Sequence, residues 1–380
     1  MADLPQQVDI LIIGTGPVGM TLARALEGGP WSTLLIDRRH LEARRDDPRA
    51  LALSHGAREL LEQIEAWPAR AATPIETIHI SHRGGFGRAY MDRREYGLEA
   101  LGYVVRYRDL AAALAARLPA GAILDETEVQ DIAPGPDHLA VTLRHKGESL
   151  SLRASLVIHA EGTPADEPGI KVSDYRQHAV IAEVRPSPAH GRQAWERFTP
   201  DGPLALLPLG DEYSVVFTLP PDKADRVMAL DDAGFLAALK AQFGNRLDFT
   251  AAGPRARFPL ALRMREQLVA GREVWIGNTA QTLHPVSGQG FNLGLRDAWQ
   301  LAETLLAKGL GDDALAAYVR ARRLDRQGGA LFTDGIVRAF SSDFGPLKLA
   351  RGLGLLALDL FPPARHFIAK RMIWGARAWP

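Results

Sequence analysis

The sequence predicts an α/β fold in which a parallel sheet covered by helices is interrupted by a second, mainly β part. A run rich in β-branched residues and leucine at 8–13 leads into a glycine-rich turn, a helical segment at 20–27 and a buried strand at 33–36, which together form a β-α-β unit. The chain has 380 residues, more than one hydrophobic core usually holds. The stretch 172–258 is richer in proline and in strand-like runs, as expected of an inserted domain.

The other elements follow from hydrophobic periodicity and from turn residues between the periodic segments. Helices are expected where apolar residues recur at helical spacing, and strands where short apolar or alternating runs are bounded by glycine, proline or charged residues. In chain order, the expected elements are helices at 57–67 and 108–118, a hairpin of strands at 139–143 and 149–158, a helix at 235–243, a strand at 273–276 and a helix at 293–306.

Composition narrows the classes of partner. Lysine plus arginine and aspartate plus glutamate both number 45, so the formal net charge is zero and no general affinity for nucleic acid is expected. Cysteine is absent, which excludes disulfides, thiolate metal ligands and a cysteine nucleophile, and no histidine spacing indicates a metal site. The first residues lack the pattern of a signal peptide, and no apolar run of about 18 residues occurs. We therefore expect a cytoplasmic protein.

The first glycine motif has the spacing of a dinucleotide-binding loop. Gly14, Gly16 and Gly19 directly follow the first strand and open the first helix. Such glycines allow a tight turn, a close backbone approach to a pyrophosphate and close packing of helix on strand. Asp37 ends the second strand, where a ribose hydroxyl would need an acceptor. The motif predicts a dinucleotide site and leaves the identity of the dinucleotide open.

A second, longer glycine motif indicates which dinucleotide is bound. Residues 277–297 read GNTAQTLHPVSGQGFNLGLRD and lead into a helix. Here the sequence resembles the FAD-dependent aromatic hydroxylases, in particular the ubiquinone-biosynthesis group that includes the 2-polyprenyl-6-methoxyphenol hydroxylases. The resemblance runs nearly end to end. Its other matched segments are 49–54, 79–87, 102–105, 196–199, 202–208 and the tail 334–361.

The resemblance implies a Rossmann-like FAD-binding domain of the glutathione-reductase type, interleaved with a mixed-sheet substrate domain. On that division the FAD-binding domain is discontinuous, and a helical segment closes the chain. The expected ranges are 1–75, 98–171 and 259–340 for the FAD-binding domain, 76–97 and 172–258 for the substrate domain, and 341–380 for the C-terminal helical segment.

The resemblance also implies roles for individual residues near the adenosine end of FAD. Gly14, Gly16 and Gly19 would hold the pyrophosphate, and Asp37 the adenosine ribose. Two arginines match positions that reach the phosphate and ribityl regions of the cofactor, namely Arg49 and Arg108.

The second motif is expected to surround the flavin ring. Asn278, after Gly277, stands where many flavin hydroxylases carry an aspartate that bonds the ribityl chain, and an amide can still donate and accept there. Backbone N–H groups at the helix start would face the flavin pyrimidine and stabilise the reduced anion. Pro285 would lie beside the reactive edge, and His284 is either a catalytic base or a structural hydrogen bonder. The residues expected at the helix start are Gly288, Gln289, Gly290, Phe291 and Asn292.

By resemblance, the protein would use molecular oxygen to hydroxylate the ring of a polyprenylated phenol through a flavin hydroperoxide. Where the family usually has Asp-Gly followed by an arginine, this chain has Glu161-Gly162 and no arginine, so the reductant is open between NAD(P)H and a separate electron-transfer protein. The apolar run 347–361 is either a helix packed on the core or a contact with a membrane or a partner. We expect a cytoplasmic location, with peripheral contact at the inner face of the membrane and membership of a ubiquinone-biosynthesis complex left open.

Two classes of alternative stay open. One is a flavin enzyme on the same scaffold that acts on another aromatic substrate or performs another reaction; a halogenase would carry a Trp-x-Trp element, which this sequence lacks. The other is a non-catalytic flavin-binding subunit of a biosynthetic complex. Glycines at three sterically demanding positions argue against an idle site.

Overall fold

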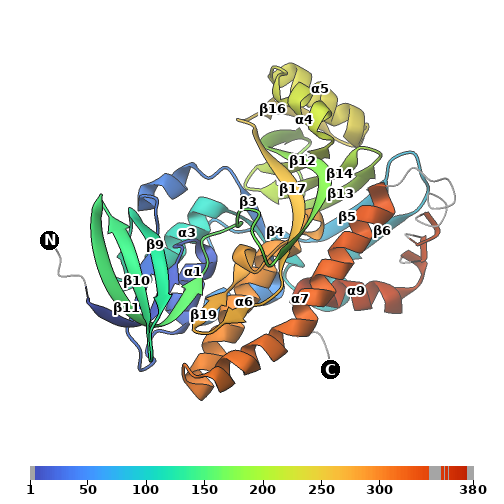
Figure 1. Ribbon diagram of the computed structural model, residues 1–380. Coiled ribbons are helices and arrows are strands. Elements are labelled where there is room, and N and C mark those ends of the chain that lie inside the picture. The colour runs from blue at the N-terminus through green and yellow to red at the C-terminus, as the bar shows by residue number, and fades with distance from the viewer. Residues whose placement is uncertain (1–4, 342–351, 355, 358, 375–380) are drawn as a thin grey trace.

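The computed structural model describes residues 5–341, 352–354, 356–357 and 359–374, and its architecture confirms the predicted α/β fold with a second, interleaved sheet (Figure 1). The first sheet has eight strands, in the order β18-β19-β11-β1-β2-β8, with β10 and β9 added beside β11. All pairings from β8 to β19 along this order are parallel. Its strands are β1 (Gln7–Ile13), β2 (Thr33–Ile36), β8 (Ile123–Leu124), β9 (Thr127–Pro134), β10 (Leu139–His145), β11 (Glu148–His159), β18 (Val269–Ala270) and β19 (Glu273–Trp275).

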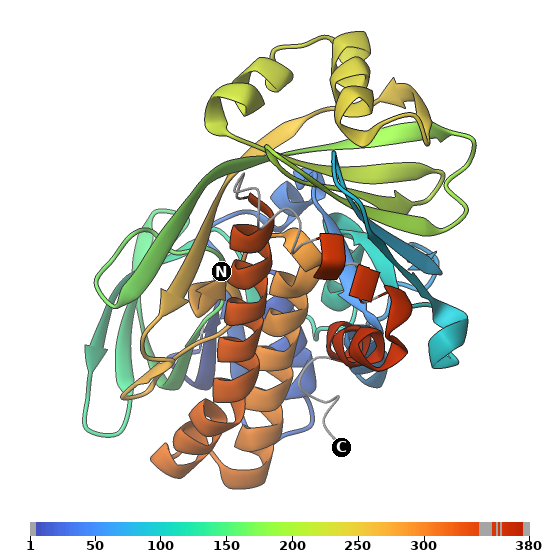
Figure 2. The same cartoon turned by 90° about the vertical axis from the view of Figure 1, so that its right-hand side faces the viewer.

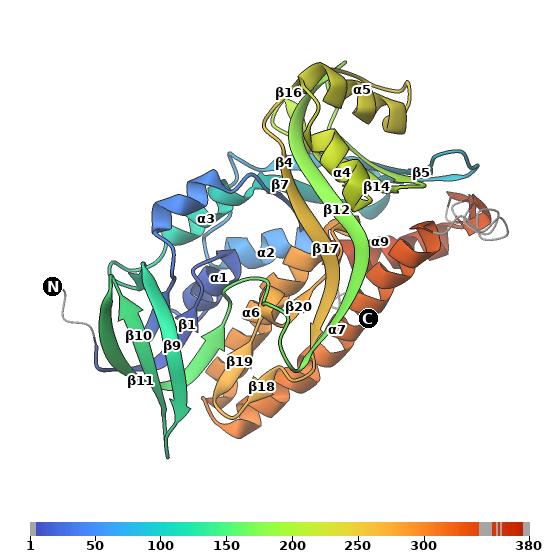
Figure 3. The same cartoon turned by 45° about the horizontal axis from the view of Figure 1, so that its top comes forward.

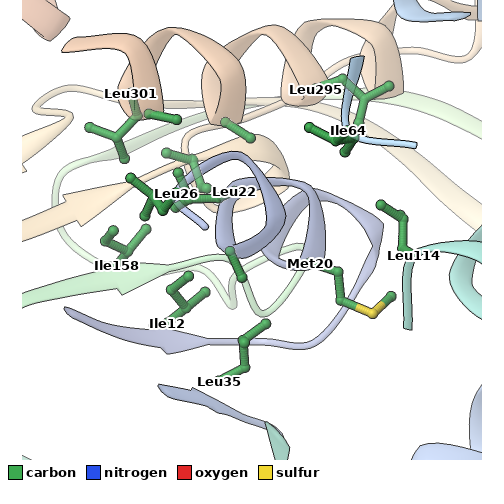
Figure 4. Packing of buried hydrophobic residues seen from close by; sticks show 14 of the residues in the cluster. Ile12, Met20, Leu22, Leu26, Leu35, Ile64, Leu114, Ile158, Leu295 and Leu301 are labelled. Atoms are coloured by element: carbon green, nitrogen blue, oxygen red, sulfur yellow. The ribbon is translucent and has the colours of Figure 1, made fainter. Parts of the chain in front are cut away.

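The core of this first part lies between the sheet and two helices, α1 (Pro17–Ala25) and α6 (Gln289–Lys308). Side chains alternate along β1, so Ile10 and Ile12 face the helices while Leu11 and Ile13 face the β9–β10–β11 side. In Figure 4, Ile12 and Leu35 from the sheet lie opposite Met20 of α1. Helix α1 begins just after the carboxyl end of the parallel strand β1, where α/β folds bind ligands.

The second sheet has nine strands and forms the inserted part. Its order is β20-β17-β12-β15-β14-β13-β5-β6, and β16 pairs with β12. Two small helices cover its outer face and bury a separate core with it (Figure 3). Its elements are β5 (Thr77–His82), β6 (Arg88–Asp92), β12 (Ile170–Ser187), β13 (Gln193–Thr199), β14 (Gly202–Leu209), β15 (Glu212–Leu219), α4 (Pro221–Met228), α5 (Asp232–Phe243), β16 (Asp248–Ala252), β17 (Ala256–Arg265) and β20 (Gln281–Thr282).

A small three-stranded sheet in the order β3-β7-β4 joins the two parts. Its middle strand contacts β14 of the large inserted sheet, and β3 contacts α6. Single turns of 3₁₀ helix, η1 to η4, connect several of these elements. The elements of this region are η1 (Leu41–Asp46), β3 (Ala50–Ser54), α2 (His55–Gln63), β4 (Thr73–Ile75), η2 (Arg93–Tyr96), β7 (Gly102–Arg106) and α3 (Tyr107–Ala115), and those near the second glycine motif are η3 (Gly277–Thr279) and η4 (Val286–Gly288).

The long helix α7 (Asp312–Ser341) packs along α6 and reaches the inserted sheet, as Figure 2 shows. The last described helix, α9 (Pro362–Trp374), packs against α2. Among the described helices, none is long and apolar enough to cross a membrane. Residues 342–351, 355 and 358 of the predicted tail segment lie outside the described part of the chain.

The hairpin predicted at 139–158 is present as β10 and β11. Helix α6 starts at Gln289 instead of residue 293, because Gly288 takes a left-handed conformation and begins the helix directly after the loop. The expected domain boundary at 259 falls inside β17, which pairs with β12 along most of its length, so the inserted sheet continues to Arg265. The predicted boundary coincides with Pro259, but β17 continues through this proline to Arg265.

A buried ion-pair network joins α6 to α7. Asp297 is 1% exposed, and its carboxylate accepts hydrogen bonds from Gly277 N (3.0 Å), from the Gln281 amide and from Arg322 Nε (2.7 Å). Arg322 also pairs with Asp325, 2.9 Å away. Buried charges are tolerated only when such partners compensate their lost hydration. The network therefore fixes the second glycine motif to two helices.

Replacing Arg322 tests whether the ion-pair network stabilises the fold. Arg322→Met leaves the buried Asp297 carboxylate without its cationic partner, so we expect the free energy of unfolding to fall by about 3 kcal/mol, measured by urea denaturation. The matched control is Arg323→Met, one residue along α7, where the side chain is exposed and a change within about 0.5 kcal/mol is expected. Equal losses in the two variants would contradict a structural role for the network.

Candidate functional site

The fold itself requires glycine at two positions of the first motif. Gly14 has φ +103°, and a Cβ there would lie 2.5 Å from the carbonyl carbon of Ala160. A Cβ on Gly19 would lie 2.1 Å from the carbonyl oxygen of Gly14. No side chain fits at either distance, so both glycines allow β1, α1 and the end of β11 to meet.

Gly16 differs from its two neighbours. Its backbone is extended, with φ −67° and ψ 170°, a conformation open to any residue. A Cβ there would meet only the Tyr107 hydroxyl, at 3.3 Å. No side chain caps α1, whose first turn begins with Pro17, so its free N–H groups point toward the loop. The protein packing leaves room at Gly16, which fits a loop kept clear for a pyrophosphate.

Asp37 holds the glycine loop in place. Its carboxylate is buried and accepts hydrogen bonds from the backbone N (3.1 Å) and hydroxyl (2.8 Å) of Thr15, and from Arg39 N (3.0 Å). These contacts tie the end of β2 to the glycine loop. The sequence located this residue correctly at the end of β2, and its role toward the ribose stays a prediction.

The two predicted arginines occupy different environments. The Arg49 guanidinium lies 4.8 Å from the centre of the Tyr107 ring, and Asp47 holds it in a bidentate pair at 2.6 to 3.2 Å. Because the Tyr107 hydroxyl adjoins Gly16, Arg49 is placed above the glycine loop. Arg108 is half exposed, with Asp109 3.9 Å away. The predicted cofactor contact is therefore better supported for Arg49 than for Arg108.

The two glycine motifs meet at one valine. Gly277 has φ +63°, and its N–H donates to the buried Asp297 carboxylate. Val18 of α1 lies against both Gly277 and Gly294, so a Cβ on either glycine would come within 3.1 Å of it. Gly294 was not among the predicted site residues, although helical spacing from Gly290 places it on the face toward α1. Asn278 follows in the same loop and donates to the Thr163 hydroxyl at 3.4 Å.

The start of α6 is built on β3. Gly288 has φ +61°, and a Cβ there would lie 3.0 Å from the Cβ of Ala52. Asn292, 2% exposed, accepts from Ser54 N (2.9 Å) and donates to the carbonyl oxygens of Ala52 (2.9 Å) and Gly288 (2.8 Å). These hydrogen bonds of the Asn292 side chain hold β3 against the helix. As Gly288 also lacks a capping side chain, the first N–H groups of α6 stay available.

His284 and Pro285 lie just before this helix. His284 is 1% exposed; its Nδ1 accepts from Val286 N at 3.1 Å, and its buried Nε2 has no hydrogen-bond partner. Burial lowers the pKa of His284 to about 4, so the ring is neutral at physiological pH. Its edge meets the Tyr175 ring, with centroids 5.1 Å apart. These contacts favour the structural interpretation of His284, while Pro285 is partly exposed beside it.

His159 was missed by the sequence analysis. It ends β11, stacks on Trp275 with centroids 4.8 Å apart, and lies between the carboxylates of Glu161 (3.3 Å) and Glu273 (2.9 Å). Burial alone would lower the pKa of His159, but the hydrogen bonds from its ring to these two carboxylates outweigh burial and raise it to about 9. Glu161 therefore pairs with a charged histidine at the end of β11.

An apolar cavity of about 70 Å³ opens beside the α6 start. Gln289 and Asn292 form its polar wall, next to the β3 backbone. The remaining wall is aliphatic and comes from three separate parts of the chain, including α9. Its apolar side chains are those of Ala52, Leu53, Ile75, Ile78, Met91, Leu101, Ala369 and Ile373.

Comparison with known proteins gives the family. Residues 7–328 match the model of the FAD binding domain family. The chain belongs to this family. The predicted resemblance is thereby confirmed, and FAD is the cofactor of the family. The two sterically closed glycines, the open position at Gly16 and the uncapped start of α6 fit a flavin dinucleotide lying between α1 and α6.

The similarity to relatives extends over nearly the whole chain. Ubiquinone hydroxylase UbiL of Rhodospirillum rubrum is 32% identical, over 98% of this chain and 91% of that protein. The 3-demethoxyubiquinol 3-hydroxylase of Escherichia coli is 28% identical, over 93% and 95%. The crystal structure of p-nitrophenol 4-monooxygenase PnpA from Pseudomonas putida superposes with a TM-score of 0.79 at 17% identity, covering 98% of this chain and all of that one. The structural match confirms the fold of this FAD-binding protein.

The open position at Gly16 makes a sharp prediction. Gly16→Val should fold, because the extended backbone accepts a β-branched residue, but the side chain would occupy the space of the pyrophosphate and abolish FAD binding. The control Gly311→Val makes the same substitution just before α7, where nothing lies within 4 Å of a Cβ. The measurement is FAD content by visible absorbance, with circular dichroism as a check on folding. Full FAD occupancy in Gly16→Val would refute the pyrophosphate assignment.

Proposed function

We propose that this protein is an FAD-dependent monooxygenase that uses molecular oxygen to hydroxylate the ring of a polyprenylated phenol in ubiquinone biosynthesis. The observation that carries the proposal is the aliphatic cavity beside the start of α6, because a lipid-tailed ring needs apolar surface next to the flavin. The names of the two bacterial relatives, a ubiquinone hydroxylase and a demethoxyubiquinol hydroxylase, support the same substrate class.

One set of residues in the site would bind the cofactor, and another set would bind the substrate. Gly16 and the α1 start would hold the pyrophosphate of FAD, and the first N–H groups of α6 would stabilise negative charge on the reduced ring. When bound, FAD would supply the activation of molecular oxygen. Asn292 keeps β3 against α6 and so makes this wall of the site rigid.

The lipid tail lies in the aliphatic cavity under α9. Ala369 and Ile373 of this helix close the cavity over Ile78 and Met91 of the inserted sheet. The polar wall at Gln289 and Asn292 is opposite, so the ring end of a substrate points toward α6 and the tail end toward α9. This orientation places an aromatic head beside the flavin.

A peripheral contact with the membrane follows from the same orientation. Large apolar side chains near α9 are exposed, including Leu360 (72%), Phe361 (59%) and Phe367 (59%). Exposed apolar side chains grouped in this way are typical of surfaces that meet a lipid or a partner. Leu353 and Leu356 of the preceding segment are also exposed, which supports the membrane alternative for the described part of 347–361.

The tail hypothesis is tested with phenols that carry zero, one, two or three isoprene units. Burial contributes about 0.8 kcal/mol per CH₂, so even if half is lost to ordering, the half-saturating concentration should fall about tenfold for the first buried unit. The effect should level off once the tail leaves the cavity. The assay is single-turnover hydroxylation after photochemical reduction, which needs no knowledge of the natural reductant.

Matched variants of α9 test whether the isoprene tail gains its affinity in the aliphatic cavity. Ala369→Leu fills the cavity and should remove most of the tenfold gain, whereas Ala364→Leu, on the same helix but outside the cavity lining, should preserve it. Equal catalytic efficiency across the phenol series, or a preference for a tail-free carboxylated phenol, would contradict the lipid-tailed substrate and indicate a general aromatic hydroxylase. Full FAD binding with no hydroxylation of any phenol would favour the non-catalytic alternative.

Pro285 gives a second test of the ring position. Its ring fixes the backbone at φ −67° and offers no N–H donor beside the flavin. Pro285→Ala should retain FAD but release severalfold more hydrogen peroxide per oxygen consumed in the presence of substrate, because the loop is looser. Pro220→Ala, at the start of α4 in the outer layer, is the control. Unchanged coupling in Pro285→Ala would show that the reactive edge lies elsewhere.

A further inference from the structure

The face of the inserted sheet that looks toward the FAD-binding part carries one unexplained carboxyl group, Glu196 of β13. Alternation along this strand places Trp195 on the outer face, where its ring packs on Phe243 of α5 with centroids 5.4 Å apart. Ala194, Glu196 and Phe198 therefore point to the inner face. The proposed function leaves Glu196 without a role.

Its neighbours place Glu196 over the flavin side of the site. Two residues before it, Ala194 packs on Ile75 and Val104 of the joining sheet. Two residues after it, Phe198 packs on Val286, which directly follows Pro285. Ile75 lines the apolar cavity, and η4 contacts β3. Glu196 is therefore held between the cavity end of the site and the loop that carries Pro285.

The residues beside Glu196 in the sheet register are aliphatic. Ile80 of β5 is its partner on one side and Ala205 of β14 on the other, and Val216 and then Ile181 continue the same row. Its side chain is partly accessible, but the Oε1 atom is buried and has no hydrogen-bond partner among the residues that the structure describes. A buried carboxyl oxygen without a partner costs stability, so a polar group of a ligand is the natural partner.

The titratable groups that face this side of the sheet are Glu183, Tyr175, His284 and Asp334. Glu183 of β12 forms a bidentate pair with Arg106 of β7, at 2.6 and 2.8 Å. His284 and Tyr175 contact each other, and Asp334 of α7 lies by Tyr175 and Arg338. Among the described residues, no charged neighbour shifts Glu196, and burial raises its pKa to about 8. A carboxyl with that pKa can both accept and return a proton near neutral pH.

We propose that Glu196 binds the phenol hydroxyl of the substrate and accepts its proton. This inference rests on the proposed function. The O–H bond of the phenol breaks and a new O–H bond forms on the carboxylate, leaving a phenolate whose ring is richer in electrons. After the ring has been hydroxylated and its carbon has lost a proton to solvent, Glu196 returns its own proton to the same oxygen, so the enzyme ends unchanged.

The test compares Glu196→Gln with the wild type, using a phenol that carries one isoprene unit. Gln has the same shape without an ionisable proton. We expect the rate of single-turnover hydroxylation to fall about 100-fold and the inflection near pH 8 in its pH profile to disappear. The ultraviolet difference spectrum of the bound phenol should also lose its phenolate band, a readout independent of turnover.

Two further variants keep the test decisive. Glu196→Asp retains the carboxyl and should recover the phenolate band with a shifted inflection. Thr218→Val removes another unpartnered buried polar atom from the same sheet face and should leave profile and spectrum unchanged. A Glu196→Gln protein with the wild-type pH profile and phenolate band would overturn the proposal for Glu196. Failure of the wild type itself to bind or hydroxylate any prenylated phenol would overturn the proposed function instead.

Discussion

The contact between the two glycine motifs is the constraint on which the site depends. Val18 lies against Gly277 and Gly294, and the Asp297 carboxylate fixes Gly277 from behind while Arg322 neutralises its charge. Because these groups are buried, α1 and α6 can approach each other in only one arrangement. The uncapped N-termini of both helices are then available to FAD, whose pyrophosphate is anionic and whose flavin ring is flat.

The inserted sheet adds side chains for a substrate, of which the FAD-binding part offers few. The first part offers backbone N–H groups and few side chains to a substrate, whereas the inner face of the second sheet offers an aliphatic row with a single carboxyl at Glu196. α9 covers the edge of this face and closes the cavity with Ala369 and Ile373. A phenol with an apolar tail matches this combination of one hydrogen-bonding group and an extended apolar wall.

Much of this arrangement could be predicted from the sequence, for a physical reason that differs between regions. Gly14, Gly19 and Asp37 belong to a β-α-β unit whose contacts are local, so spacing alone located them. The hairpin of β10 and β11 is local as well. Arg322, by contrast, meets Asp297 only because α7 folds back along α6, and no periodicity in either segment reports that pairing. The boundary expected at 259 coincides with Pro259, and only the pairing of β17 with β12 shows that the strand continues through this proline.

Roles that depend on long-range packing were the hardest to foresee. His284, expected to be either a catalytic base or a structural hydrogen bonder, is buried against Tyr175, and its Nδ1 accepts from Val286 N of its own loop. Asn292, expected at the flavin, uses its side chain to hold β3. Glu196 lay inside a matched segment, but only the register of β13 between β5 and β14 shows which way it points.

We propose that this chain adds one oxygen to a lipid-tailed phenol on the route to ubiquinone. Mass spectrometry of lipid-soluble quinone precursors in cells that lack the chain tests this directly. We expect accumulation of a polyprenylated phenol that is one ring oxygen short, with a matching loss of ubiquinone and recovery when the gene is restored. An unchanged quinone pool, with no such precursor, would contradict it.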